Sequence, residues 1–253
     1  MNKLSLGLAA SLLALGMAGC DSKSDGGSTG KAGSTATAPM VTTAPNGDWS
    51  KLVNATAEGG MLLGNPNAKV KLVEFASMTC SFCANFATQD KPKLVDQYVK
   101  TGNVSFEFRN YVRDPLDITA SLIARCAGAT PQFFALTDAM FAEQEAISNR
   151  IAAVPQDQLA ALQQLPPAQQ FQRLAQLSGL QEFAAQRGLP SAKSSQCLAN
   201  QAEIDRLVQM VSDATSQYDI TGTPTFLVNG EVKSLAAGTP TFNQVDAWIK
   251  EAL

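Results

Sequence analysis

The chain has no histidine among its 253 residues. This absence excludes a Ser-His-Asp triad, a Cys-His nucleophile pair and every zinc site that needs imidazole. Positive charge is not in excess either, because 19 Lys and Arg against 22 Asp and Glu give a formal net charge of -3. The balance provides no basic surface for phosphates, so nucleic acid is not expected as a partner. Chemistry in this chain must use cysteine, carboxylate, backbone groups or a bound ion, and we predict no cofactor and no metal site.

The N-terminus lacks an apolar run long enough for a permanent membrane span. A basic Lys3 precedes a short apolar run, which predicts a signal peptide over residues 1–19. The run ends in Met-Ala-Gly-Cys20, which resembles the lipobox of bacterial lipoproteins, whose cysteine receives a diacylglycerol. The alternative is an ordinary cleaved signal with a chance cysteine. We predict lipidation at Cys20 and, because Asp21 resembles an inner-membrane retention residue, an exported protein anchored on the periplasmic side of the inner membrane.

Residues 20–48 are rich in Ser, Gly, Thr, Ala and Pro and poor in large apolar side chains. Such a segment cannot offset the entropy cost of folding, so it is predicted to be a flexible tether. The folded part is divided into residues 49–113, residues 114–202 and residues 203–253.

The first of these parts reads as a β-α-β unit. Residues 70–75 and 104–109 are predicted as strands, and residues 84–98 as a helix with a kink at Pro92. Residues 114–202 are almost entirely helical in period, with breaks at prolines.

The last part begins with a predicted helix over residues 201–218 and ends with one over residues 242–253. Between them, the stretch TPTFLVNGEV is a strand, an Asn229-Gly230 turn and a returning strand, which is a strong hairpin signal. The chain is therefore predicted to be α/β, in the order β-α-β, helical block, α-β-β-α.

The motif Cys80-Ser81-Phe82-Cys83 lies where the first strand ends and its helix begins. Unpaired N–H groups and the helix dipole stabilise a thiolate there, and thiols of this type have pKa values of about 3.5–7.5 instead of about 8.5. We predict that Cys80, nearer the helix start and more exposed, is the attacking thiolate. Cys83, one turn further, is predicted to resolve the mixed disulfide.

Two other roles for the cysteines are alternatives to redox chemistry. A zinc site could use Cys80, Cys83, Cys126 and Cys197, but the last two are isolated on helical segments instead of forming a second CxxC knuckle. A lone CxxC could also be inert packing.

Three motifs in this order resemble the DsbA-like thiol:disulfide oxidoreductases. They are VEFASMTCSFC, then the Pro92-to-Val104 pattern with Arg109, and GTPTFLVNG after a helical insertion. The resemblance implies a thioredoxin fold with an inserted α-helical domain.

The resemblance also implies roles for three further residues. Glu74 matches an acidic residue beneath the active site that helps to move the proton of the resolving cysteine; the alternative is a glutamate facing the sheet edge. Pro224 matches the family's cis-proline, which lets the backbone of Thr223 bind a substrate peptide as an added strand. Cys126 and Cys197 resemble a second, structural disulfide of some members, the alternative being two buried free thiols.

The dipeptide Ser81-Phe82 departs from the Cys-Pro-His-Cys motif of the best-known members. The histidine there would stabilise the thiolate, so its absence predicts a weaker oxidant. A reduction potential as high as about -120 mV would contradict this prediction.

The leading functional hypothesis is an enzyme that introduces disulfides into exported proteins with cysteine pairs. A membrane protein, quinone-linked, would regenerate its disulfide, and we predict that the enzyme is a monomer. The alternatives are a reductase or isomerase kept reduced by a membrane electron donor, and a non-enzymatic binding lipoprotein with a thioredoxin fold.

Overall fold

The computed structural model describes residues 43–239 and 241–253. The predicted signal peptide, Cys20 and the tether up to residue 42 lie outside the described residues. None of the helices in the described part of the chain is long and apolar enough to cross a membrane.

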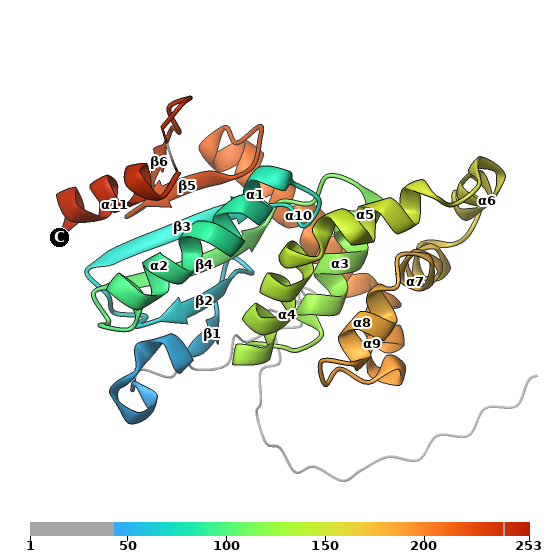
Figure 1. The fold of residues 1–253 in the computed structure, drawn as a ribbon, viewed down its shortest axis with the longest axis horizontal. Helices are drawn as coiled ribbons and strands as arrows, with labels where there is room; N and C mark the ends of the chain where they lie inside the picture. The colour runs from blue at the N-terminus through green and yellow to red at the C-terminus, as the bar shows by residue number, and fades with distance from the viewer. Residues whose placement is uncertain (1–42, 240) are drawn as a thin grey trace, which may run out of the picture. The chain divides into compact units, whose positions relative to one another are not determined.

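A six-stranded mixed sheet organises the fold, with the strand order β1-β2-β4-β3-β5-β6 (Figure 1). β3 and β4 are parallel and every other neighbouring pair is antiparallel. The strands are β1 (Val53–Ala55), β2 (Met61–Gly64), β3 (Val70–Ala76), β4 (Val104–Asn110), β5 (Thr225–Val228) and β6 (Glu231–Lys233). β3, which leads to the cysteine motif, is therefore a central strand.

The register of β3 decides which of its side chains face which helices. Glu74 lies opposite Phe108 of β4 and Phe226 of β5, and residues opposite each other in a sheet point to the same face. That face carries the main core. Val73 and Phe75 point to the other face and pack in a second cluster with Ala214, Ile220 and Leu227.

The helical run after β3 is continuous but not uniform. It consists of α1 (Ser81–Asn85), the π-helical turn η3 (Phe86–Asp90), α2 (Lys91–Leu94) and the π-helical turn η4 (Val95–Val99). Pro92 lies at the start of α2, directly after a π turn. A proline inside a helix removes one backbone hydrogen bond and clashes with the preceding turn. The structure departs from regular α-helical geometry directly before Pro92, at the π turn η3, and α2 starts at Lys91. The kink itself stays a prediction.

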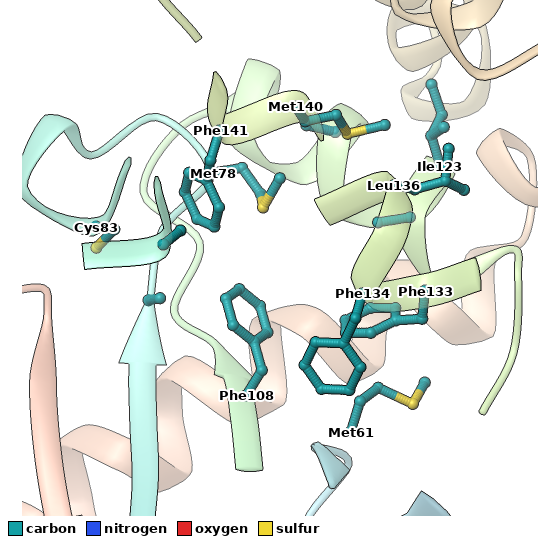
Figure 2. Close-up of a cluster of buried hydrophobic side chains, with 14 of the residues drawn as sticks. Met61, Met78, Cys83, Phe108, Ile123, Phe133, Phe134, Leu136, Met140 and Phe141 are labelled. Carbon is teal, nitrogen blue, oxygen red and sulfur yellow. The ribbon is translucent and has the colours of Figure 1, made fainter. Parts of the chain in front are cut away.

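Seven helices make up the block between β4 and α10 (Gln201–Tyr218). They are α3 (Pro115–Arg125), α4 (Pro131–Ala142), α5 (Gln144–Ala152), α6 (Gln156–Leu162), α7 (Pro167–Leu177), α8 (Leu180–Ala185) and α9 (Ser191–Leu198). α4 packs on the sheet through aromatic rings: the centroid of Phe108 lies 5.9 Å from that of Phe133 and 6.3 Å from that of Phe141. Figure 2 shows these rings in one cluster with Met78, which lies in the loop of residues 77–79 before Cys80, called here the cysteine loop.

The C-terminal part returns the chain to the sheet. α10 (Gln201–Tyr218) is followed by the β5–β6 hairpin and α11 (Thr241–Ala252). Asn229 and Gly230 in the hairpin turn have φ of 50° and 89°. Asparagine and glycine tolerate this left-handed region, which explains why their pair was a reliable signal for the hairpin.

The α/β architecture with an inserted helical block is confirmed, but the sequence analysis missed β1 and β2. Both are short, and their hydrophobic period is interrupted by the turn of Thr56 to Gly60, where the Thr56 N–H donates to the Gly60 carbonyl at 3.0 Å. Strands of three and four residues give too few alternations to predict from the pattern alone.

Candidate active site

Cys80 occupies the N-cap of α1, as its sequence position predicted. Its φ and ψ of -91° and 119° are extended, and α1 begins at the next residue. The thiol donates a hydrogen bond to the carbonyl oxygen of Thr223 at 3.3 Å. Cys80 is only 4% exposed and Cys83 is 0% exposed, so the predicted order of exposure is right but the difference is small.

The surroundings of Cys80 favour its anion. A hydrogen bond from the Cys83 thiol is the largest cause that lowers the pKa of Cys80 to about 5, against the opposing effect of burial. The side chain of Thr223 and the backbone N–H groups of Cys83 and Phe82 lower this pKa further. At pH 7 the reduced protein therefore holds Cys80 as a thiolate.

Cys83 has the opposite character. Burial raises the pKa of the Cys83 thiol far above its ordinary value, and its hydrogen bond to Cys80 raises it further. The charge of Glu74 acts in the same direction. Cys83 therefore retains its proton unless a neighbouring base removes it.

Glu74 is a buried carboxyl group on the core-facing side of β3. It is 2% exposed, and its Oε1 atom has no hydrogen-bond partner. Burial raises the pKa of Glu74 to about 8, although the charge of Lys91 opposes this shift. The alternative of a glutamate facing the sheet edge is wrong, because β3 is a central strand. A carboxyl group with a pKa near neutrality can both release and accept a proton.

Lys91 is a buried cation that the sequence analysis did not single out. It is 6% exposed, pairs with Asp138 of α4, and its ammonium lies 5.1 Å from the ring centroid of Phe134. No sequence signal marks it, because a lysine among other charged residues of an amphipathic helix is ordinarily solvated.

The Thr223–Pro224 peptide bond is cis, as the resemblance implied. The hydroxyl oxygen of Thr223 is buried without a hydrogen-bond partner. It is therefore free to donate to a thiolate at Cys80.

Of the two residues between the cysteines, Phe82 is the more distinctive. It is 70% exposed, whereas most large apolar side chains of the described residues are buried or partly buried. Ser81 is also exposed and begins α1. The face of the molecule next to Cys80 is therefore partly apolar.

Cys126 and Cys197 form a disulfide with a Cα–Cα distance of 5.8 Å. The bond joins the end of α3 to α9. The alternative of two free thiols is therefore wrong in this structure. Because these cysteines are bonded to each other, they are not available for a four-cysteine zinc site with Cys80 and Cys83.

Three residues of the helical insertion contact the loop of residues 77–79 before Cys80 and were not predicted from the sequence: Asp114, Asp117 and Gln144. Asp117 could have been noticed, because Asp114 and Asp117 flank the first turn of a helix in the spacing of a capping pair. Gln144 is one of many glutamines in the insertion, and no sequence signal distinguishes it.

A CxxC pair at a helix N-terminus, opposite a cis-proline before an antiparallel strand, on a mixed sheet, defines a thioredoxin-fold dithiol site. The profile of the thioredoxin family matches residues 56–251, and the chain belongs to that family.

Comparison with solved structures gives the same fold. The protein-disulfide isomerase from Novosphingobium aromaticivorans is 33% identical, with a TM-score of 0.67, over 74% of this chain and 96% of that one. Alpha-DsbA1 from Wolbachia pipientis, 23% identical over 78% of this chain and 94% of its own, has a TM-score of 0.59 and supports the fold alone.

Curated relatives include a protein of Rickettsia bellii that is provisionally named a protein-disulfide oxidoreductase. It is 25% identical over 198 residues, which are 78% of this chain and 65% of that protein. A similarly named protein of Rickettsia conorii is 26% identical over 68% of this chain and 54% of its own length. The chain thus spans between about half and two thirds of these relatives.

Proposed function

We propose that this protein is a thiol:disulfide oxidoreductase that introduces disulfides into exported proteins by passing on a Cys80–Cys83 disulfide. The observation that carries the proposal is that two neighbouring thiols have pKa values shifted in opposite directions. Cys80 is held as an anion at the N-cap of α1, while Cys83 is buried and protonated beside it. The names of the Novosphingobium and Rickettsia relatives support the same class of reaction.

The reaction consists of two thiol–disulfide exchanges. A substrate thiolate attacks the sulfur of Cys80, the Cys80–Cys83 bond breaks, and Cys83 leaves with the electron pair and takes a proton from Glu74. The second substrate thiolate then attacks the substrate sulfur of the mixed disulfide and expels Cys80 as a thiolate. The substrate loses two electrons and the enzyme gains them. Of the two protons that the substrate thiols release, one restores the protonated form of Glu74 and the other goes to water.

The low pKa of Cys80 favours this direction. A stable thiolate is a good leaving group, so the second exchange releases Cys80 readily and the oxidised substrate departs. The reduced enzyme then needs an oxidant, for which we propose a quinone-linked membrane protein. Because no histidine lies between the cysteines, we still predict that this protein is a weaker oxidant than the enzymes with a Cys-Pro-His-Cys motif.

The redox state at rest tests the direction. Cells are quenched with acid and alkylated, and we expect Cys80 to be blocked by its disulfide with Cys83. In a Cys83→Ser variant, Cys80 can still attack the disulfide of a client, which is the reverse of the second exchange, but Cys83 can no longer release the client. Mixed disulfides with client proteins are therefore expected to accumulate, and a Cys80→Ser/Cys83→Ser variant is the control. A free Cys80 at rest would favour the reductase or isomerase, and a Cys83→Ser variant without trapped clients would favour the binding protein.

We also propose that the protein is anchored to the membrane through a lipid on Cys20, supported by the apolar run and the small residues before it. Labelling with a fatty-acid analogue is expected to mark the wild-type protein and not a Cys20→Ala variant. Equal labelling of both proteins would contradict the anchor.

A further inference from the structure

The loop of residues 77–79, between β3 and Cys80, is held by a buried carboxylate from the helical insertion. Asp117 of α3 is 0% exposed. It accepts a hydrogen bond from the Ser77 hydroxyl at 2.5 Å and one from the Met78 N–H at 2.8 Å. Burial raises the pKa of Asp117 to about 6, so the group is still mostly ionised at pH 7 and can accept both bonds.

Residues directly before α3 extend this contact to the residue before Cys80. Asp114, the N-cap of α3, accepts a hydrogen bond from the Thr79 hydroxyl at 2.7 Å and one from the Asp117 N–H at 2.9 Å. Arg113 donates to the hydroxyls of Ser77 at 2.9 Å and Thr79 at 3.2 Å. The polar side chains of the loop are thus joined to the first turn of α3.

Gln144 holds the same loop from a second helix. It is the first residue of α5, and its side-chain amide donates to the carbonyl of Met78 at 2.9 Å and to that of Cys80 at 3.1 Å. The amide therefore bonds to the backbone of the reactive cysteine itself. The side chain of Met78, 4% exposed, points into the apolar cluster beside Phe141 (Figure 2).

These contacts act on the part of the backbone that sets the position of the reactive sulfur. A thiolate at an N-cap depends on short contacts with the first N–H groups of its helix, and electrostatic stabilisation falls off steeply with distance and with exposure to water. The loop contributes a further bond of its own, from the Cys80 N–H to the Ser77 carbonyl at 3.1 Å.

We propose that Asp117 and Gln144 are positioning residues: from the helical insertion they hold the loop so that the sulfur of Cys80 stays over the first N–H groups of α1. The insertion thereby sets the reactivity of a site whose cysteines belong to the thioredoxin-fold part. Its role in this proposal is to keep the pKa of Cys80 low.

The test compares Asp117→Asn and Gln144→Leu with the wild-type protein. After mild reduction, with mass spectrometry verifying that Cys126–Cys197 stays bonded, the alkylation rate of Cys80 is followed against pH. We expect the apparent pKa of Cys80 to rise by about one unit in Gln144→Leu, which at pH 5 leaves about fivefold less thiolate. In Asp117→Asn we expect a smaller rise, because the Asp117 carboxyl group, with a pKa of about 6, is itself mostly protonated at pH 5. Gln144→Leu changes no charge and lies at a partly exposed helix start, so it is informative even if Asp117→Asn does not fold.

Ser178→Ala is the matched control. Its hydroxyl is buried and donates to the Leu174 carbonyl at 2.6 Å inside the insertion, so its loss mimics a general weakening of that region. We expect no change in the pKa of Cys80 in this variant. An unchanged pKa in Gln144→Leu would overturn the proposal. So would a fall in Asp117→Asn, because it would mean that the sulfur of Cys80 keeps its stabilising contacts without this side chain.

The inference rests on the proposed function only in taking Cys80 as the reacting sulfur, and the two can fail separately. A wild-type protein that oxidises no dithiols, but whose Cys80 pKa rises in both variants, would refute the function and keep the positioning role. A wild-type protein that does oxidise dithiols, but whose Cys80 pKa is unchanged in both variants, would keep the proposed function and refute the positioning role.

Discussion

Replacing Glu74 by glutamine is expected to raise the free energy of unfolding by about 4 kcal/mol at pH 7.5 and to leave it nearly unchanged at pH 4. The pKa of this carboxyl group is about 8 in the folded protein and about 4.5 in an unfolded chain. Between these values the folded state holds a proton that the unfolded state has released. Stability therefore falls by about 1.4 kcal/mol per pH unit as the pH rises from 4.5 to 8. Glutamine does not titrate, so the variant loses this slope.

The measurement is urea unfolding at both pH values, with Cys80→Ser in both proteins. That substitution removes the neighbouring thiolate and avoids any reductant, so the Cys126–Cys197 disulfide stays intact. The other charges acting on Glu74 are those of Lys91 and Asp138, which are the same in both proteins. Parallel pH profiles for the two proteins would contradict the prediction.

The same substitution should be costly for the reaction. Cys83 is buried and holds its proton, so an exchange that needs its thiolate is slow without a nearby base. In the otherwise wild-type enzyme, Glu74→Gln is expected to slow the resolution of a mixed disulfide by Cys83, which is the reverse of the first exchange, by about 10²-fold, the lower end for loss of general acid–base catalysis. Glu107→Gln is the matched control, because Glu107 lies on the neighbouring strand and is partnered by Thr56 and Arg109. It should lower stability and leave the rate of resolution unchanged.

Removing the structural disulfide is the other change with a large expected effect. Cys126 and Cys197 are 71 residues apart in sequence, and a cross-link over such a loop restricts the unfolded chain by about 4 kcal/mol. A Cys126→Ala/Cys197→Ala variant should therefore lose about this free energy of unfolding in urea.

The double variant should lose stability without a change in the reactivity of Cys80. The alkylation rate of Cys80 at pH 7 should match that of the wild-type protein, because Cys126 lies at the C-terminal end of α3, whereas the loop before Cys80 is held by the first turn of that helix. A stability loss below about 1 kcal/mol would mean that the bond restrains little in the unfolded state.

The elements that were predicted well are those specified by short-range signals. The β5–β6 hairpin follows from Asn229-Gly230, whose residues tolerate the turn conformation, and α10 has the bounds expected from its period. β1 and β2 were missed because three and four residues show almost no periodicity. Their places in the sheet come from pairing with each other and with β4, a contact that no local pattern encodes.

By itself, the sequence determined that a dithiol lies where a strand gives way to a helix, since the motif and the flanking periods are all within a few residues of each other. Only the tertiary structure decided how those sulfurs differ. Glu74 lies between β4 and β5, two strands that are far apart in the sequence, and Ser77 and Met78 are held by partners 40 and 66 positions away. Proton affinity inside a protein depends on distance and on exclusion of water, and both are properties of the packed molecule.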